Sequence, residues 1–317
     1  MSDTIMQIKN VTKKFFLDKG KVLTACDNIS LDIPKGKTFG IVGESGCGKT
    51  TLLKAIMNID PPTEGEIIFG GRDITKLKGE ELRQNYRRMQ LVFQDPTAAF
   101  NPKMRVKDII TEPLINFNLI KKSEIAGKAK ELLRQVELPE DFSERYPHNM
   151  SGGQRQRVAI ARALALEPEI IACDEATSAL DVSVQDTIIK LLVKLQKEKG
   201  FTYIFICHDL ALVSLFAHKM AVMYLGNVME ILDGKDIEMA KHPYTKALLG
   251  SVFSVDKGKN KEVTVLEGEI PSPLNMPTGC PFQNRCVYKQ DICAKEKPSL
   301  KEIEDGHFTA CHFPLNS

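Results

Sequence analysis

Long apolar runs and a large net charge are both missing from this sequence of 317 residues. No stretch approaches the roughly 18 apolar residues that a membrane-spanning helix needs, and the run at residues 203–207 has only the length of a strand. Lysine and arginine number 43 against 41 acidic residues, so the overall charge gives no argument for nucleic acid or anionic membrane. The first residues lack the basic and apolar segments of a signal peptide. We therefore expect a cytosolic protein, or one that docks on a membrane through other subunits.

Closely spaced cysteine pairs are also lacking. Four of the eight cysteines cluster near the C-terminus, namely Cys280, Cys286, Cys293 and Cys311. A cytosolic location disfavours disulfides, and four thiolates in a short, proline-rich segment can hold an iron–sulfur cluster or a zinc ion. Zinc sites usually contain a C-x2–4-C pair, which the C-x5-C-x6-C-x17-C spacing does not offer. His307 and His312 are alternative zinc ligands, and unliganded thiols are the third possibility.

Residues 43–50 fit the pattern G-x-x-x-x-G-K-[ST] between a predicted strand at 38–42 and a predicted helix at 51–57. This order directs backbone N–H groups and a helix N-terminus at phosphate oxygens. Lys49 is expected to reach the β- and γ-phosphates, and the Thr50 hydroxyl to hold Mg²⁺. The alternative is a glycine-rich turn that merely precedes a helix. The predicted nucleotide-binding residues here are Gly43, Glu44, Ser45, Gly46, Cys47, Gly48, Lys49, Thr50 and Thr51.

An aromatic partner for a purine ring is available upstream of this loop. Phe15 and Phe16 fall in a basic stretch that we expect to be flexible, between predicted strands at residues 5–11 and 22–25. Either one could stack on adenine, because the flat face of a purine suits an aromatic side chain. The alternative is a core aromatic of the strand layer.

Further polar residues stand at the ends of predicted elements downstream. Residues 104–150 have a helical pattern, and a long helix then starts after Ser151, Gly152, Gly153 and Gln154. Ser151 is either a plain helix cap or part of a second anion site, since two glycines accompany it. Asp174 and Glu175 end an apolar strand, where an aspartate can hold Mg²⁺ and the next glutamate can accept a proton from water. His208 ends the following strand.

Together with Gln94 and Asp181, these elements in this order resemble the ATP-binding cassette (ABC) transporter ATPases over residues 5–235. The resemblance implies an α/β P-loop NTPase fold with a RecA-like core, an antiparallel β subdomain and an inserted α-helical subdomain. It places an ATP-binding domain at residues 1–240, with the helical subdomain at about 95–160. Residues 241–317 are then an irregular, cysteine-containing extension.

The resemblance also implies a role for each matching residue. Glu175, His208, Lys49 and Gln94 would be catalytic, with Glu175 as the general base for ATP hydrolysis. Thr50, Gln94 and Asp174 would serve Mg²⁺. Ser151, Gly152, Gly153 and Gln154 would complete the ATP site of a second cassette, identical or related, and Asp181 would lie at that junction.

A narrower resemblance covers residues 93–102, 242–249, 268–273 and 279–312, which are similar to the oligopeptide/dipeptide importer branch. It implies a peripheral ATPase on the cytoplasmic face of the cell membrane, with two permease subunits and, indirectly, an extracytoplasmic binding protein. Short peptides would be the cargo, with nickel or another small solute as the alternative. It also favours a [4Fe–4S] cluster at the four cysteines over Zn²⁺.

Two other functions fit the sequence less well. A soluble ABC ATPase that acts on ribosomes or DNA usually has two cassettes or a long coiled-coil insertion, and the balanced charge offers no basic stripe for nucleic acid. A redox-sensing protein that merely binds nucleotide does not need the intact Asp174, Glu175 and His208.

Overall fold

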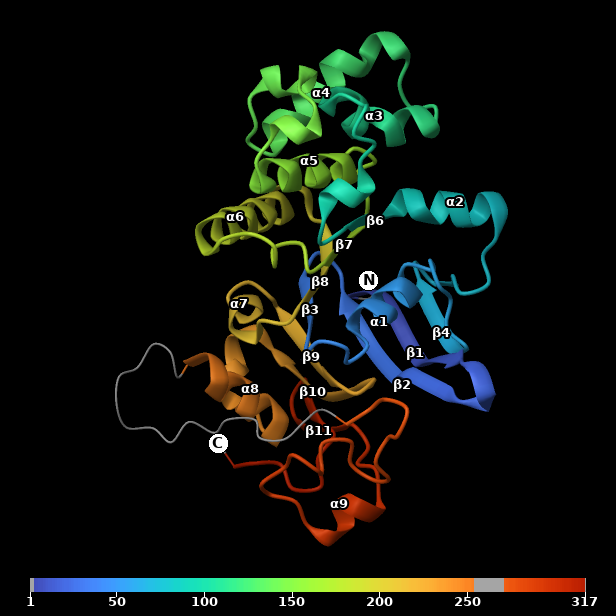
Figure 1. Ribbon diagram of the computed structural model, residues 1–317, viewed down its shortest axis with the longest axis vertical. Coiled ribbons are helices and arrows are strands. Elements are labelled where there is room, and N and C mark those ends of the chain that lie inside the picture. Colours follow the sequence, from blue (N-terminus) through green and yellow to red (C-terminus); the bar gives the residue numbers. More distant parts are fainter. Residues whose placement is uncertain (1–2, 254–270, 317) are drawn as a thin grey trace. The chain divides into compact units, whose positions relative to one another are not determined.

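The computed structural model describes residues 3–253 and 271–316, which form two compact units (Figure 1). The first unit comprises residues 1–76 and 206–317, and the second comprises residues 77–205. The C-terminal segment from residue 241 onward therefore belongs to the same unit as residues 43–50. Residues 268–270 of the importer-like pattern lie outside the described residues. Every described helix is too short or too polar to cross a bilayer.

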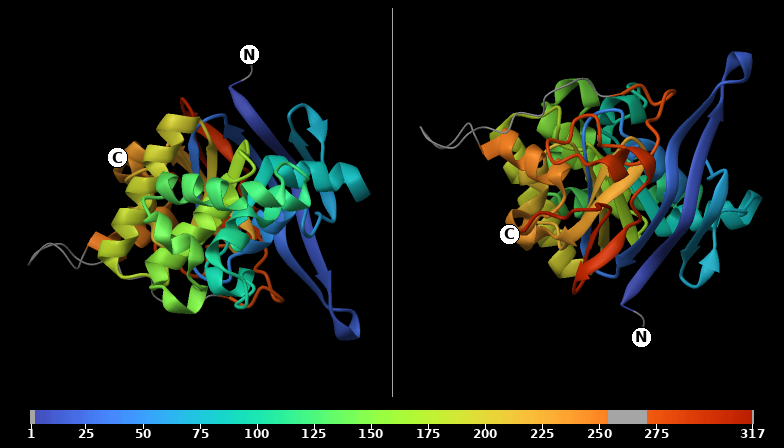
Figure 2. Two further views of the ribbon diagram at one scale, coloured as in Figure 1. Left: turned by 90° about the horizontal axis from the view of Figure 1, so that it is seen from above. Right: turned by 90° about the horizontal axis from the view of Figure 1, so that it is seen from below.

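The first unit contains an antiparallel sheet with the strand order β2-β1-β4-β5. Its strands are β1 (Thr4–Phe16), β2 (Val22–Pro34), β4 (Glu64–Phe69) and β5 (Arg72–Asp73). Met6 pairs with Ile33 on one side and with Phe69 on the other, and all three side chains are buried. Figure 2 shows β1 and β2 as one long twisted hairpin. Alternating apolar residues thus give this sheet its buried face.

Two sequence predictions for this hairpin are wrong. β2 runs without a break from Val22 to Pro34, well beyond the strand expected at residues 22–25. β1 continues through Phe15 and Phe16, which pair with Leu23 and Val22, so this stretch is not flexible coil. The basic residues around the two phenylalanines concealed a strand whose pairing is satisfied by β2, the next strand of the same hairpin.

A second sheet in the first unit carries the phosphate-loop strand. Its strands, in the order β11-β12-β10-β9-β3, are β11 (Lys301–Glu304), β12 (His307–Thr309), β10 (Asn227–Asp233), β9 (Lys219–Tyr224) and β3 (Thr38–Val42). β3 and β9 are parallel, whereas β10 is antiparallel to both β9 and β12. The hairpin β11–β12 therefore makes the C-terminal segment part of this sheet, a feature that the sequence did not predict. Residues 271–281 have no helix or strand, as predicted.

The described residues of the first unit also form the helices α1 (Lys49–Ile56), α7 (Leu210–Ser214), α8 (Pro243–Phe253) and α9 (Asp291–Lys295). α1 begins two residues before the predicted helix and buries Leu52, Leu53 and Ile56. A short 3₁₀ turn connects β1 to β2 (Asp18–Gly20), and another precedes α8 (Gly234–Met239).

The second unit combines three strands with a layer of helices. Its elements are α2 (Gly79–Arg88), β6 (Met89–Val92), α3 (Val106–Asn116), α4 (Ile125–Gln135), α5 (Gly152–Leu164), β7 (Ile170–Asp174), α6 (Val182–Lys199) and β8 (Thr202–Cys207), the last of which belongs to this unit as far as Phe205. Short 3₁₀ turns lie at Pro96–Ala99, Lys122–Glu124, Glu140–Glu144 and Pro147–Asn149. β6 runs parallel to β7.

Helices α3, α4 and α5 of the second unit lie together (Figure 1). Of the periodic apolar positions expected to form one helix face, Ala129, Leu132, Leu133 and Val136 are buried, while Ile125 is half-buried. The period of these residues therefore correctly predicted the buried face of α4. The expected helical layer within residues 104–150 is present.

Candidate functional site

The loop between β3 and α1 requires glycine at two positions. Gly43 has φ of +150° and Gly48 has φ of +104°. A Cβ atom on Gly43 would lie 2.2 Å from the carbonyl oxygen of Met223, and one on Gly48 would lie 2.2 Å from that of Ala25. No other residue type fits such close backbone approaches at these angles. The spacing of the two glycines in the sequence is thus a requirement of the loop geometry.

Lys49 is folded back over this loop. Its side chain is buried, and Nζ donates hydrogen bonds to the carbonyl oxygens of Gly43 at 2.8 Å and of Glu44 at 3.0 Å. Both acceptors are neutral, so an anionic phosphate oxygen would be a stronger partner for the ammonium. The first turn of α1 contains no acidic residue, which leaves its positive end available to an anion. The loop has the donors that a phosphate group needs.

Gln94 and Glu175 of the second unit are linked through Ser178. Gln94 Nε2 donates to Ser178 Oγ at 3.1 Å, and Ser178 Oγ donates to the backbone carbonyl of Glu175 at 2.9 Å. Glu175 has φ of +46°, a left-handed conformation that non-glycine residues seldom adopt. Such backbone strain is concentrated at functional sites, because the surrounding structure must hold it. The side chain of Glu175, at the tip of β7, is half-buried.

Ser151 caps α5, as the simpler sequence interpretation predicted. Its hydroxyl accepts from the backbone N–H of Gln154 at 3.3 Å, while Gln154 Oε1 accepts from the N–H of Ser151 at 2.9 Å. This reciprocal pair is a capping box. Gly153 is needed for packing, since a Cβ atom there would lie 2.5 Å from Val184 of α6. Gly152 is less constrained, since a Cβ atom there would lie 3.3 Å from the Leu180 side chain. The second anion site at this helix start stays a prediction.

The other predicted residues lie at the ends of elements. Asp174 is the last residue of β7 and is half-buried, and His208 follows β8 and is exposed. Asp181 caps α6 by accepting from the N–H of Val184, and hydrogen bonds from the Ser183 hydroxyl and this amide lower its carboxyl pKa. Lys49, His208 and Phe15 belong to the first unit, whereas Gln94, Ser151, Asp174, Asp181 and Glu175 belong to the second.

Neither candidate adenine partner is a core aromatic. Phe16 is 75% exposed, and Phe15 is half-buried with the Lys13 ammonium 5.3 Å from its ring centre. The alternative that they belong to the core of the strand layer is therefore wrong. Their role in stacking on adenine stays a prediction.

The four C-terminal cysteines line one small cavity of about 20 Å³. Burial, with smaller contributions from the nearby thiols of Cys311, Cys293 and Cys286, raises the pKa of Cys280 to about 11. Four thiols in one cavity are the donor set of zinc and iron–sulfur sites. Within residues 3–253 and 271–316, however, no three His, Cys, Asp or Glu side chains are grouped closely enough to hold a metal ion. A cavity of this size holds about one water molecule.

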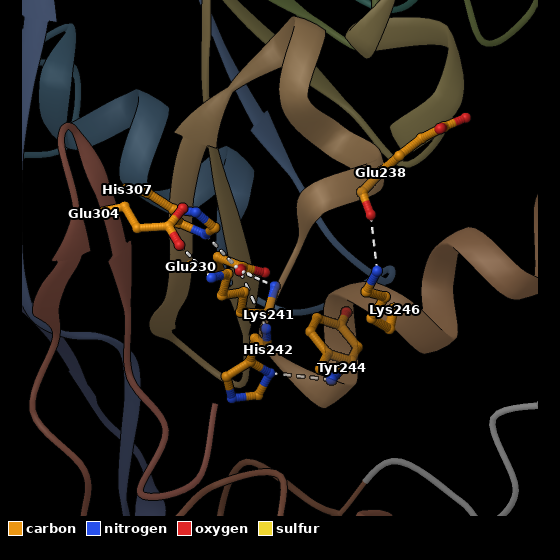
Figure 3. Close-up of polar contacts among 8 residues, drawn as sticks. All are labelled: Glu230, Glu238, Lys241, His242, Tyr244, Lys246, Glu304 and His307. Carbon is orange, nitrogen blue, oxygen red and sulfur yellow. Dashed lines mark hydrogen bonds and ion pairs between the residues drawn. The ribbon is translucent and has the colours of Figure 1, made fainter. Parts of the chain in front are cut away.

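Of the two alternative zinc ligands, His307 lies elsewhere. His312 lines the cysteine cavity, but His307 does not, and its Nε2 pairs with Glu230 at 2.8 Å. Glu230 is fully buried in β10, and the same oxygen also accepts from the backbone N–H groups of Lys241 and His242 (Figure 3). Sequence reasoning missed this carboxylate, because a single glutamate within a strand carries no local signal.

Comparison with known proteins assigns the chain to a family. Residues 26–178 match the ABC transporter family, and residues 229–293 match the C-terminal region of oligopeptide/dipeptide transporters. A probable peptide ABC transporter ATP-binding protein of Sinorhizobium fredii is 45% identical over 98% of this chain and 90% of its own length. The chain belongs to the ABC transporter ATP-binding proteins of the oligopeptide/dipeptide branch. The oligopeptide transport ATP-binding protein AppF of Bacillus subtilis is likewise 45% identical, over 98% of this chain and 97% of its own.

Solved structures confirm the ABC cassette fold. The cassette MJ0796, in a dimeric post-hydrolysis state with ADP and Pi, is 35% identical with a TM-score of 0.66 and covers 72% of this chain and 98% of its own. CbiO1 of Clostridium perfringens, part of an ABC transporter complex, is 26% identical with a TM-score of 0.67. The match covers 80% of this chain and 96% of the CbiO1 chain. The expectation that this ABC protein is an ATPase is confirmed.

Proposed function

We propose that this chain is the ATPase subunit of an importer for di- or oligopeptides, working on the cytoplasmic face of the cell membrane. The observation that carries the proposal is the preformed loop at residues 43–50 in a chain whose C-terminal segment matches oligopeptide/dipeptide transporters. The curated relatives named above are described as peptide or oligopeptide transport proteins along nearly the whole of this chain. Import of nickel or another small solute is the second candidate within the same branch.

The residues of the first unit bind the nucleotide in this proposal. Lys49 exchanges its two carbonyl acceptors for phosphate oxygens, and the backbone of residues 43–51 surrounds the phosphates. Phe15 is the residue that stacks on adenine. Its ring is half-buried and already lies beside the Lys13 ammonium, whereas the ring of Phe16 is largely exposed. His208 contacts the terminal phosphate.

The residues of the second unit complete the chemistry. Mg²⁺, when bound, neutralises phosphate charge, and its ligands would be Thr50 and Asp174 with help from Gln94. Hydroxyl, carboxylate and amide oxygens are the donors that this hard cation prefers. Glu175 accepts the proton of the attacking water. Its backbone is fixed by Ser178, so Gln94 and Glu175 form one connected group.

Hydrolysis requires a second cassette in this proposal. Ser151, Gly152, Gly153 and Gln154 close the ATP site of a partner cassette, either a second copy or a related chain. A helix N-terminus supplies the donors that one phosphate loop leaves uncovered. Two permease subunits and, indirectly, an extracytoplasmic binding protein complete the importer. MJ0796 is a dimer in its post-hydrolysis state, which supports this arrangement.

We also propose that the four cysteines hold a metal centre, either a [4Fe–4S] cluster or Zn²⁺. Their meeting at one cavity supports a metal site, and the cluster is included because the sequence of this tail resembles the oligopeptide/dipeptide importer branch. Because no three of the described side chains are grouped closely enough to hold a metal ion, either centre would require the loops around this small cavity to move. Metal analysis after anaerobic purification separates the cases: a brown protein with about four irons supports the cluster, and a colourless zinc protein overturns it.

Peptide uptake is the direct test of the proposed function. Cells that lack the chain are given a peptide as the sole source of a required amino acid. The wild-type chain is expected to restore growth, and the Glu175→Gln variant is not. Restored uptake of nickel but not of peptide would support the second candidate instead. Co-purification with nucleic acid rather than with membrane subunits would contradict both.

A further inference from the structure

The phosphate loop is joined to the C-terminal segment by a partly buried ion pair. Arg285 donates to both carboxylate oxygens of Glu44, from Nη1 to Oε2 at 2.8 Å and from Nη2 to Oε1 at 3.1 Å. The side chain of Arg285 is 4% exposed, and that of Glu44 is 21% exposed. Two parallel hydrogen bonds between charged groups fix both the distance and the orientation of the carboxylate. Glu44 is therefore held in one position.

The two partners come from different parts of the family pattern. Glu44 lies in the segment that matches ABC transporters in general, whereas Arg285 lies in the segment that matches oligopeptide/dipeptide transporters. They are 241 residues apart in the sequence. The ion pair is thus a contact that the C-terminal segment adds to the common phosphate loop.

A tyrosine holds the backbone of the same loop residue. The N–H of Glu44 donates to the hydroxyl of Tyr244 at 3.1 Å, and Tyr244 is fully buried. The Tyr244 ring packs against Tyr224 at 4.8 Å and against Phe282 at 5.2 Å between ring centres. Phe282 belongs to the C-terminal segment, three residues before Arg285. Aromatic packing of this kind leaves the hydroxyl little freedom to move.

The position of Tyr244 depends in turn on the Glu230 cluster, defined here as Glu230, Lys241, His242 and His307. One oxygen of Glu230 accepts from the N–H of Lys241 at 2.6 Å, from the N–H of His242 at 3.1 Å and from His307 at 2.8 Å. His242 Nδ1 then accepts from the N–H of Tyr244 at 3.0 Å (Figure 3). The start of α8 is therefore fixed to β10 and to the C-terminal hairpin.

Three polar groups of Glu44 thus have hydrogen-bond partners: its carboxylate, its backbone N–H and its backbone carbonyl. Arg285 holds its carboxylate, Tyr244 holds its N–H, and the Lys49 ammonium contacts its carbonyl oxygen. Loss of Arg285 would leave a half-buried carboxylate without its counter-charge, and such a group moves toward water. The loop that carries it would then lose the shape in which Lys49 and the glycines face a phosphate.

We propose that Arg285 and Tyr244 are positioning residues that hold residues 43–50 in their ATP-binding shape, so that the C-terminal segment is part of the nucleotide site. The proposal rests on the proposed binding of ATP at this loop. It assigns a function in ATP binding to a segment that the shared cassette does not contain. Neither residue touches the reacting atoms.

The test compares MgATP affinity in matched variants of the full-length chain. Arg285→Ala is expected to weaken MgATP binding roughly 10-fold or more, since a hydrogen-bonded charge pair is lost. Tyr244→Phe, which removes only the accepting oxygen, is expected to weaken it roughly two- to tenfold. Lys297→Ala is the control, because Lys297 joins the same segment to Asp27 by a single exposed ion pair at 2.6 Å that involves none of residues 43–50. It should leave affinity unchanged.

Further variants separate positioning from general stability. Arg285→Lys should recover part of the affinity, and Glu44→Ala combined with Arg285→Ala should bind no more weakly than the worse single variant, because both remove one interaction. Melting temperatures are recorded for every variant. An Arg285→Ala protein that melts lower but binds MgATP as tightly as Lys297→Ala overturns the proposal. If Arg285→Ala does not fold, normal affinity of Tyr244→Phe overturns it.

One more variant distinguishes this proposal from the one on which it rests. Lys49→Ala should abolish most MgATP binding. Unchanged binding by Lys49→Ala would overturn the assignment of ATP to this loop. Lost binding in Lys49→Ala together with wild-type binding in Arg285→Ala and Tyr244→Phe would leave that assignment intact and overturn only the positioning roles.

Discussion

Gln94 and Ser178 are joined by a hydrogen bond of 3.1 Å, and Ser178 passes the connection on to the backbone of Glu175. Ser178→Ala removes both hydroxyl bonds and leaves the Glu175 carbonyl with only the backbone N–H of residue 178, at 3.1 Å, as its partner in this turn. We expect the rate of ATP hydrolysis to fall roughly two- to tenfold per lost neutral hydrogen bond, with little change in the KM for ATP. Steady-state phosphate release measures both quantities.

A hydroxyl elsewhere in the same unit gives the control for Ser178→Ala. Thr187 on α6 is exposed, and its Oγ1 donates to the carbonyl of Ser183. Thr187→Ala should retain the wild-type rate. Equal rates for the two alanine variants would show that the link from Gln94 to Glu175 has no part in hydrolysis.

Glu175→Gln tests the assignment of the general base. The amide keeps the size of the side chain but cannot accept a proton from water, so hydrolysis should slow roughly 100-fold or more. Binding of MgATP should persist, because the phosphates are held by the loop at residues 43–50. Equilibrium binding and phosphate release are measured on the same preparation. Near-normal turnover would remove Glu175 from this role.

His242 should make stability depend on pH. Burial lowers its pKa from 6.5 to about 4, although Glu230 opposes part of this shift. Between pH 6.5 and about 4 the unfolded chain binds a proton at this histidine that the folded chain does not. The contribution of His242 to the free energy of unfolding is therefore complete above pH 6.5 and falls as the pH drops toward 4. At about 1.4 kcal/mol per pKa unit, the loss in the free energy of unfolding reaches roughly 3 kcal/mol.

Denaturant unfolding at several pH values between 7 and 4 measures this effect. His242→Asn keeps an acceptor for the Tyr244 N–H but has no proton to bind, so its stability should fall less steeply with pH than that of the wild type. His148→Asn removes an exposed histidine and serves as the control. Parallel pH profiles for the wild type and His242→Asn would contradict the assignment.

Features whose residues are contiguous could be predicted from the sequence. The loop at residues 43–50, the cap at Ser151 and the strand that ends at Asp174 are all specified within a few neighbouring positions. Their geometry depends on local properties such as glycine φ angles and helix capping. The periodic apolar residues of α4 predicted its buried face for the same reason.

Features made by distant partners could not be predicted in this way. Arg285 and Glu44 are 241 residues apart, and the residues around either one give no indication that the other is its partner. The buried Glu230 is recognisable only when the chain has brought Lys241, His242 and His307 around it. Tertiary pairing decides these cases.

The central claim is that ATP is hydrolysed at the loop of residues 43–50, in a dimer of cassettes. Phosphate release from MgATP by the wild-type and Lys49→Ala chains, followed at increasing protein concentration, tests it most directly. We predict release that rises more steeply than protein concentration for the wild type, and only background release for Lys49→Ala. Equal release by the two proteins would contradict the account.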